Sequence, residues 1–185
     1  MVKKVKIMDR TAMMRSLARI THEIIERNDG TDSLCILGIK NRGTVLSRIL
    51  ADNLKKFGGI EIPCGEIDTT MYRDDFTMEE KKRKATESYI PFDITDKAIV
   101  IVDDVLYTGR TARAAIEAIF SLGRPKAVRL AVLVDRGHRE IPLKPDFVGK
   151  SIPTSRREKI VVVTEGESEE ECGVYIVGDE EGGNA

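Results

Sequence analysis

The chain has 185 residues, of which 41% are hydrophobic and 33% are charged, proportions typical of a soluble globular protein with one domain-sized core. The formal net charge is −1, so the chain as a whole does not attract nucleic acid, and any nucleic-acid surface must be a local basic face. The sequence shows no apolar run of membrane-spanning length, no apolar signal-peptide centre and no metal-binding spacing among its three cysteines. We therefore expect a cytoplasmic protein with reduced thiols.

The first predicted element is an amphipathic helix near the N-terminus. Its apolar residues recur at helical spacing: Met13, Leu17, Ile20 and Ile24. A second set shares the opposite face and is mostly charged: Arg15, Arg19, His22 and Glu26. The pattern of this one helix fits either a solvated surface or a cationic binding face.

The next predicted unit is a buried strand, a cationic turn and a helix. The apolar run at 34–39 leads into Lys40, Asn41 and Arg42, and a helical pattern follows as far as Leu54. Ligands of α/β proteins bind at the carboxyl ends of strands. Lys40 and Arg42 are therefore either anion-binding residues or the exposed charges of an ordinary turn.

A buried strand followed by a ligand-binding turn is predicted at 99–111. Four β-branched residues precede Asp103 and Asp104, and a small-residue turn then leads into a helical pattern at 112–122. Backbone N–H groups and hydroxyls at such a helix N-terminus form a phosphate cradle, and Gly109 lets the backbone approach closely. Two carboxylates beside a phosphate need a different ligand, for which sugar hydroxyls and Mg²⁺ are the natural candidates.

The remaining segments predict further strands and two polar excursions. They are an extended stretch at 60–72, a long polar loop or hairpin with a mobile tip at 73–88, strands at 128–134, 147–149 and 160–163, an edge strand at 174–177, and a flexible acidic tail at 179–185. Alternating strands and helices predict an α/β fold with a doubly wound, mainly parallel sheet flanked by helices. Three strand ends of this sheet should converge at one edge: Lys40/Arg42, Asp103/Asp104 and Asp135/Arg136.

Six segments of the chain together resemble one known family. They are 38–43, 65–75, 91–96, 103–111, 130–140 and 149–155. The segment at 99–111 is similar to the phosphoribosyl pyrophosphate (PRPP) signature of type I phosphoribosyltransferases. The whole set resembles the bifunctional pyrimidine operon attenuation protein/uracil phosphoribosyltransferase family over about residues 5–165.

The resemblance implies a type I phosphoribosyltransferase fold in a single domain over 1–178, with a flap at about 73–88 and a small base-binding hood from about 135–157 plus the N-terminal region. It implies the reaction of uracil with PRPP to give UMP and pyrophosphate, with Mg²⁺ bound through PRPP and Asp103 and Asp104 as the only candidate protein ligands. Asp104, Asp103, Arg42 and Arg73 are the implied catalytic residues. The implied PRPP- and UMP-binding residues are Lys40, Asn41, Arg42, Tyr72, Asp103, Asp104, Val105, Leu106, Tyr107, Thr108, Gly109, Arg110 and Thr111. The implied base-binding residues are Asp135, Arg136, Phe147 and Val148.

The same resemblance implies a second activity, which is UMP-assisted binding of a stem-loop in the leader of pyrimidine operon mRNA. UMP or UTP would be the effector, a homo-oligomer (a dimer or larger) would bind the RNA, and neither DNA nor a membrane is an expected partner. The implied RNA-binding residues are Arg15, Arg19, His22, Arg27, Arg139, Lys150, Arg156 and Arg157. Two features weigh against this surface: no aromatic residue is interleaved with these cations for base stacking, and Ala18 replaces a hydroxyl residue of several relatives.

Two other functions remain open on the sequence. A purine salvage transferase is favoured by the stretch 145–149, which resembles the base-binding segment of purine transferases. Asp103 rather than Glu at the first acidic position, and Tyr107 in the loop, favour uracil instead. The third function is a regulator that senses UMP and PRPP but has little catalytic activity.

Overall fold

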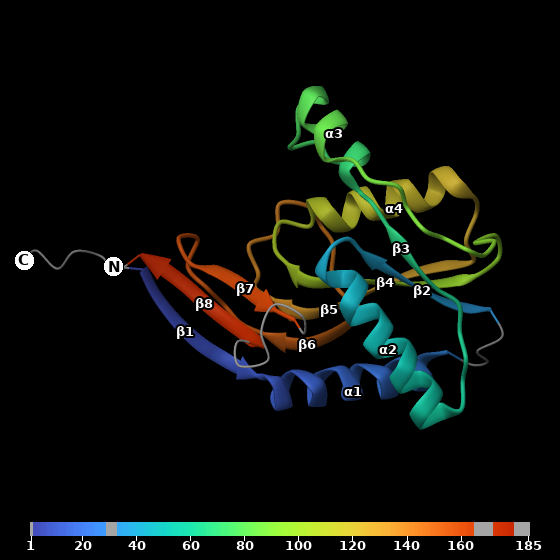
Figure 1. The fold of residues 1–185 in the computed structure, drawn as a ribbon, viewed down its shortest axis with the longest axis horizontal. Helices are drawn as coiled ribbons and strands as arrows, with labels where there is room; N and C mark the ends of the chain where they lie inside the picture. The colour runs from blue at the N-terminus through green and yellow to red at the C-terminus, as the bar shows by residue number, and fades with distance from the viewer. Residues whose placement is uncertain (1, 29–32, 165–171, 180–185) are drawn as a thin grey trace, which may run out of the picture.

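The computed structural model of the protein describes residues 2–28, 33–164 and 172–179. Within these residues the strands form a larger sheet covered by helices and a smaller sheet at one end of the molecule (Figure 1). The predicted acidic tail lies outside the described residues, except for its first member, Asp179.

The larger sheet has the strand order β3-β2-β4-β5-β6, and each neighbouring pair is parallel. Its strands are β2 (Leu34–Ile39), β3 (Cys64–Ile67), β4 (Ala98–Leu106), β5 (Ala127–Asp135) and β6 (Phe147–Ser151). The pairing register sets Gly38 beside Val102 and Leu106 beside Asp135. The strands β2, β4 and β5 therefore end at the same edge, which confirms the predicted convergence.

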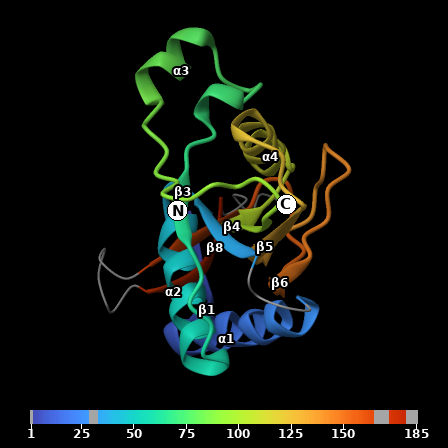
Figure 2. The same ribbon diagram turned by 90° about the vertical axis from the view of Figure 1, so that its right-hand side faces the viewer.

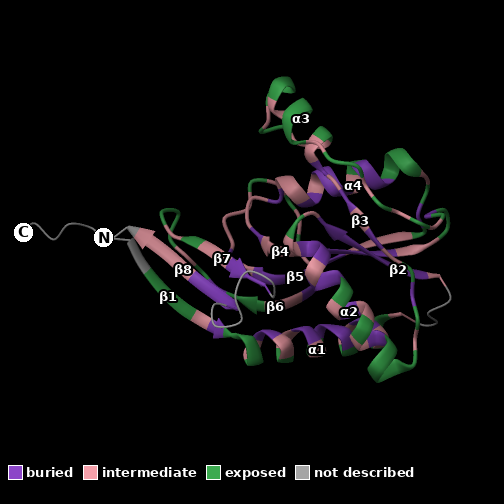
Figure 3. Ribbon diagram, in the orientation of Figure 1, coloured by how far each residue is buried: buried purple, intermediate pink, exposed green. Residues whose placement is uncertain are grey.

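Helices cover both faces of this sheet, as a doubly wound fold requires (Figure 2). The helices are α1 (Arg10–Arg27), α2 (Arg42–Gly58) and α4 (Arg110–Leu122). The strand β4 shows how one sequence serves both faces, because successive side chains of a strand point to opposite sides. Val100 and Val102 join the apolar core formed with α1 and α2, whereas Ile99 and Ile101 join the core formed with α4. Figure 3 shows the resulting buried layer along the central strands.

The smaller sheet is antiparallel with the order β1-β8-β7. Its strands are β1 (Val2–Asp9), β7 (Lys159–Val163) and β8 (Gly173–Asp179). The prediction that the last strand is an edge strand is wrong, because β8 pairs on both sides. The prediction missed β1, whose lysines interrupt the apolar signal even though Lys4 and Lys6 alternate with Val5 and Ile7 in the pattern of a half-buried strand.

The flap segment is not the plain loop that its polar composition predicted. It contains the helix α3 (Met78–Lys84), which stands away from the sheet (Figure 1). A capping box stabilises the start of this helix: the backbone N–H of Glu80 donates to the hydroxyl of Thr77 at 3.2 Å, and the Glu80 carboxylate accepts from the backbone N–H of Thr77 at 2.9 Å. The chain then returns to the larger sheet through an isolated antiparallel bridge to β3.

Cys35, Cys64 and Cys172 form no disulfide with one another in the part of the chain that the structure describes. Across the described part of the chain, no helix has the length and apolarity needed to cross a membrane.

The fold predicts a large loss of stability when the core between α2 and β4 is truncated. Leu50 is fully buried in that core, so Leu50→Ala should lower the free energy of unfolding by about 2–5 kcal/mol through lost apolar contact and a residual cavity. Urea denaturation measures this change. The control is Asp52→Ala on the exposed side of α2, for which we expect a change within about 0.5 kcal/mol. Similar losses for both variants would contradict the assigned packing of α2.

Candidate active site

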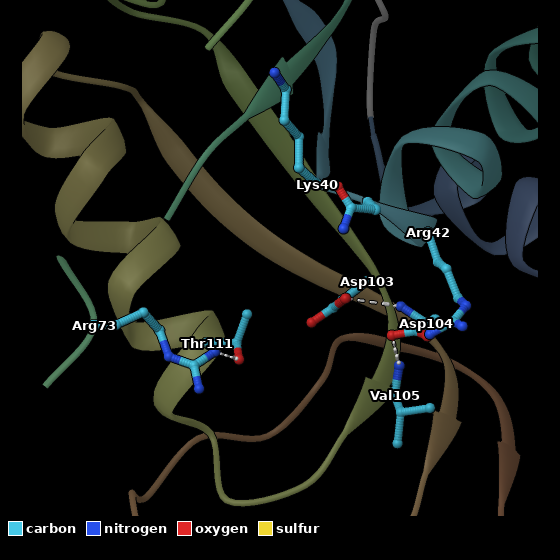
Figure 4. A pocket seen from close by; sticks show the side chains of 8 residues that line it. Lys40, Arg42, Arg73, Asp103, Asp104, Val105 and Thr111 are labelled. Carbon is cyan, nitrogen blue, oxygen red and sulfur yellow. Dashed lines mark hydrogen bonds and ion pairs between the residues drawn. The ribbon is translucent and has the colours of Figure 1, made fainter. Parts of the chain in front are cut away.

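Polar side chains gather where β2, β4 and β5 end. A cavity of about 390 Å³ opens there (Figure 4). Its lining comes from the turn after β2, from β4, from the flap and from α4: Lys40, Asn41, Arg42, Asp103, Asp104, Val105, Arg73 and Thr111. All eight residues were predicted ligand-binding or catalytic residues, and the fold brings them together from four separate segments.

The acidic pair at the end of β4 presents its two carboxylates to opposite sides of the strand (Figure 4). Asp104 Oδ2 lies 3.8 Å from Nη1 of Arg42, whereas Asp103 faces the side of Arg73 and Thr111. Burial, and secondarily the negative charge of Asp104, raise the pKa of Asp103 well above its ordinary value of 3.8. Arg73 partly offsets these effects. A cation or a hydroxyl-rich ligand would therefore interact favourably with this strand end.

The start of α2 approaches β4 unusually closely. A Cβ on Gly43 would lie 2.3 Å from the carbonyl oxygen of Val102, so the approach requires glycine. It places Arg42 beside the acidic pair, together with the uncapped N–H groups of the first turn of α2. The peptide bond between Lys40 and Asn41 in the preceding turn is cis. Helix N-termini with unsatisfied N–H groups bind anions, so this turn can hold an anionic group next to the carboxylates.

Lys40 contributes to the cavity less directly than the prediction implied. Its ammonium points away from Asp103 and Asp104 (Figure 4). It donates to the carbonyl oxygen of Glu87 at 2.5 Å, in the segment that returns from the flap. Lys40 thus connects the turn after β2 to the base of the flap.

A second cavity, of about 310 Å³, surrounds the turn between β4 and α4 and shares Arg73, Asp103, Val105 and Thr111 with the first. Gly109 has a φ of 93°, a left-handed conformation that glycine adopts without a steric penalty. Because α4 begins at Arg110, the N–H groups of this turn and the hydroxyls of Thr108 and Thr111 surround one concave space. The arrangement is that of a phosphate cradle.

The flap covers this cradle through ion pairs that the sequence analysis did not predict. Arg73 donates to the hydroxyl of Thr111 and to Asp75, with 2.6 Å between Nε and Oδ1. The hydrogen bond from Arg73 lowers the pKa of Asp75. Arg110 pairs with Asp74 at 2.5 Å. Carboxylates of the flap therefore neutralise the cations that surround the phosphate cradle.

The segment after β5 braces the cradle from its other side. Arg139 donates to the carbonyl oxygen of Tyr107 at 2.8 Å and pairs with Asp135 at 2.6 Å. The guanidinium of Arg136 lies 3.9 Å from the centre of the Tyr107 ring. The Arg136 side chain is buried and also donates to the carbonyl oxygen of Glu158 at 2.7 Å. Arg139 is a predicted RNA-binding residue and Arg136 a predicted base-binding residue. The contacts given above join both side chains to other parts of the protein.

Only two of the four predicted base-binding residues line a common cavity. This cavity of about 380 Å³ is bounded by Asp135, Arg136, Gly137, His138, Ser151, Ile152, Pro153 and Thr154. Phe147 is 1% exposed and belongs to the apolar core, and Val148, its neighbour on β6, does not line the cavity.

Among the described residues, no group of three or more histidine, cysteine or carboxylate side chains could by itself hold a metal ion. The donors fit Mg²⁺ in a different way. Mg²⁺ prefers carboxylate and phosphate oxygens and commonly binds through one or two carboxylates plus substrate phosphates. Asp103 and Asp104 would supply the protein oxygens, and a phosphorylated ligand would supply the others.

The predicted RNA-binding residues fall into two groups. Seven of the eight are exposed, and the exception is Arg139. Four of the seven lie on α1, and α1 packs along β6: Arg19 donates to the carbonyl oxygens of Val148 and Gly149, each at 2.7 Å. Lys150 follows on β6, and Arg156 and Arg157 lie in the turn between β6 and β7. The structure thus places cations from α1 and β6 side by side.

Comparison with known proteins identifies the class to which this fold and site belong. Residues 6–168 match the phosphoribosyl transferase domain family. A solved hypoxanthine-guanine phosphoribosyltransferase from Bacillus anthracis is 17% identical, covers 95% of this chain and 98% of its own, and superposes with a TM-score of 0.70. At that identity the likeness shows the fold, which is that of a type I phosphoribosyltransferase.

Relatives narrow the class. A protein from Acetivibrio thermocellus named bifunctional protein PyrR is 53% identical over 162 residues, which are 88% of each chain. A protein of the same name from Bacillus cereus is 48% identical over 178 residues, 95% of this chain and 99% of its own. The chain therefore belongs to the phosphoribosyltransferase family and, within it, to the bifunctional PyrR proteins.

The raised pKa of Asp103 predicts a stability that depends on pH. An acid whose pKa is higher in the folded state stabilises the fold when protonated, and this contribution is lost as pH rises above its ordinary value of 3.8. We therefore expect Asp103→Asn to have a larger free energy of unfolding than the wild type at neutral pH. This difference should shrink as the pH falls toward 3.8. Denaturant titrations across pH measure this, with Asp52→Asn as the matched surface control. A variant less stable than the wild type at neutral pH would contradict the assignment.

Proposed function

We propose that the protein transfers the phosphoribosyl group of PRPP to uracil, forming UMP and pyrophosphate. We also propose that it regulates transcriptional attenuation of the pyrimidine operon by UMP-dependent binding to leader mRNA. The observation that carries the first activity is the acidic pair of β4, which lies between a phosphate cradle and the cationic turn after β2. The name of the relatives, bifunctional protein, supports the presence of two activities.

In this proposal each part of PRPP has its own binding element. The 5′-phosphate binds the cradle at Thr108–Thr111, and the ribose hydroxyls bind Asp103 and Asp104. The pyrophosphate binds the turn at Lys40–Arg42, where α2 begins. Mg²⁺, bound with the pyrophosphate, supplies further positive charge to the leaving group.

The transfer itself is a substitution at C1 of the ribose. The bond from C1 to pyrophosphate breaks, N1 of uracil forms the new bond to C1, and the N1 proton is released. Positive charge develops on the ribose and negative charge on the leaving group, so carboxylates near the ribose and guanidinium groups near the pyrophosphate both stabilise the transition state. Arg42, and Arg73, which lines both cavities, would supply these guanidinium groups.

The flap is proposed to exclude water during this step, because water would otherwise hydrolyse the reactive ribose centre. The ion pairs of Asp74 and Asp75 with the cradle support this role, since a bound 5′-phosphate would compete with them for Arg110 and Arg73. The base would occupy the cavity beside Asp135 and Arg136. Arg136 would then have two roles. It would contact the base, and it would hold the cavity wall against Tyr107 of the cradle.

The RNA-binding half of the proposal is supported by the exposed cations along α1 and β6. Such a cluster can bind phosphates despite a net charge of −1, because phosphate contacts depend on the local field. A purine transferase is the alternative function, which the resemblance of the stretch 145–149 to the base-binding segment of purine transferases supports. A regulator with little catalytic activity is the third.

The choice of base is tested by measuring product formation from PRPP and Mg²⁺ with uracil, hypoxanthine or guanine. Of the three bases, we expect only uracil to be converted to its nucleotide. Arg42→Ala should lower kcat about 100-fold or more, as loss of one donor to developing negative charge does elsewhere, and Asp104→Asn should also lose activity. Arg48→Ala, on the exposed side of α2, is the control. Turnover with a purine base would favour the alternative, and no turnover with any base would favour the pure regulator.

RNA binding is tested by gel shift with a pyrimidine leader stem-loop, with and without UMP. We expect UMP to increase the affinity. Arg15→Ala should weaken binding several-fold and reduce the slope of log affinity against log salt by about 1. The charge-matched control is Lys82→Ala, because the four consecutive basic residues at 81–84 of α3 are expected to be a solvated surface. Absence of a shift at every UMP concentration would remove the regulatory activity.

A further inference from the structure

The basic surface of α1 contains an aromatic pair that the sequence did not reveal. The imidazole of His22 stacks on the ring of Phe57, which comes from the last turn of α2. The ring centroids are 5.1 Å apart and the ring planes differ by 13°. Residues 35 positions apart in the chain thus form one nearly parallel stack where α1 and α2 pack together.

This pair lies at the surface. Phe57 is 41% exposed and belongs to neither apolar core cluster of the described residues, and His22 is also exposed. The exposed part of this stacked pair is an aromatic surface that a ligand can reach, and aromatic rings stack favourably on one another.

The charges around the pair define the chemistry of that ligand. Arg15 and Arg19 share the exposed face of α1 with His22, and Lys56 places its ammonium 5.7 Å from the Phe57 ring. Arg19 is held in place by Glu23 and by two carbonyl oxygens of β6. Glu26 is the exposed acid on the same face. Three cations around an aromatic surface fit a ligand with flat rings linked by phosphates.

We propose that His22 and Phe57 form a stacking platform for an unpaired base of the RNA ligand, with Arg15, Arg19 and Lys56 contacting the flanking phosphates. This inference rests on the proposed RNA binding and extends it from charge to base contact. Proteins recognise bases of RNA chiefly where loops or bulges expose them, and they stack such bases on aromatic side chains. The platform would therefore select a loop or bulge over a continuous duplex, which cations alone do not.

The experiment uses the full chain and a pyrimidine leader stem-loop, with variants that separate ring stacking from apolar bulk. Phe57→Ala and Phe57→Leu should each bind the RNA about tenfold more weakly at fixed salt, as expected for loss of one stacked base. Their salt slopes should stay unchanged, because the phosphate contacts remain. Phe57→Trp should retain the affinity. Phe120→Ala, which alters an exposed phenylalanine of α4, is the matched control.

The tryptophan variant also gives a direct optical test. The chain has no tryptophan, so Phe57→Trp carries a single fluorophore at the platform. We expect the stem-loop to quench its emission, and a fully paired duplex of the same length to do so much less. Thermal unfolding of each variant, measured in parallel, identifies any that fail to fold, and the tryptophan signal then decides the question by itself.

The outcomes distinguish this inference from the proposed function. If the wild type binds no leader RNA at any UMP concentration, the RNA half of the proposed function fails and the platform fails with it. If the wild type binds but Phe57→Ala and Phe57→Leu bind equally well, only the platform is overturned. It is likewise overturned if the substitutions change the oligomeric state in sedimentation and weaken binding only as a consequence, because Phe57 would then contact a second copy of the chain.

Discussion

The burial of negative charge at the end of β4 is the constraint on which the candidate active site depends, and repulsion between Asp103 and Asp104 adds to it. Both carboxylates are fixed at the end of β4, where burial already disfavours charge on Asp103. Arg42 offsets the charge of Asp104 from 3.8 Å away, and it reaches that position only because Gly43 lets α2 approach the Val102 carbonyl. The positive charge of Arg73 in the flap favours the charged form of Asp103 and partly offsets its burial. The anionic strand end therefore exists between two guanidinium groups, one fixed by a helix and one carried by the flap.

The flap extends this charge balance to the phosphate cradle. Asp74 pairs with Arg110 and Asp75 with Arg73, so carboxylates offset the cations beside which a phosphate would bind. Any phosphate that enters must compete with these carboxylates. Phosphate binding and the flap equilibrium are consequently coupled. Whatever free energy the flap contacts cost phosphate binding, phosphate binding must cost the flap contacts.

The central features of this site could be predicted from the sequence for a physical reason. A buried strand followed by Asp103-Asp104 and a glycine-containing turn is a local pattern, and the parallel sheet then fixes which strand ends meet. The features that could not be predicted from the sequence depend on contacts between segments that are far apart in the chain. The pairing of Arg110 with Asp74, the use of Arg139 as a brace for Tyr107, and the stack of Phe57 on His22 each join residues at least 32 positions apart in the chain. In the small sheet only β1 was missed, for a similar reason, because β1 forms a strand through its pairing with the distant β8.

The position of β6 gives a physical reason why a nucleotide, rather than PRPP, would act on RNA binding. Val148 and Gly149 of β6 accept hydrogen bonds from Arg19 of α1, and Ser151 at the end of the same strand lines the cavity assigned to the base. The turn assigned to pyrophosphate follows β2, which lies across β4 and β5 from β6. If UMP binds as proposed, its base would lie against the strand that holds α1, the helix that carries four of the proposed RNA contacts. PRPP has no base, and in the proposed binding mode it would contact the cradle, the acidic pair and the pyrophosphate turn, so it would lack a contact with β6 that UMP makes.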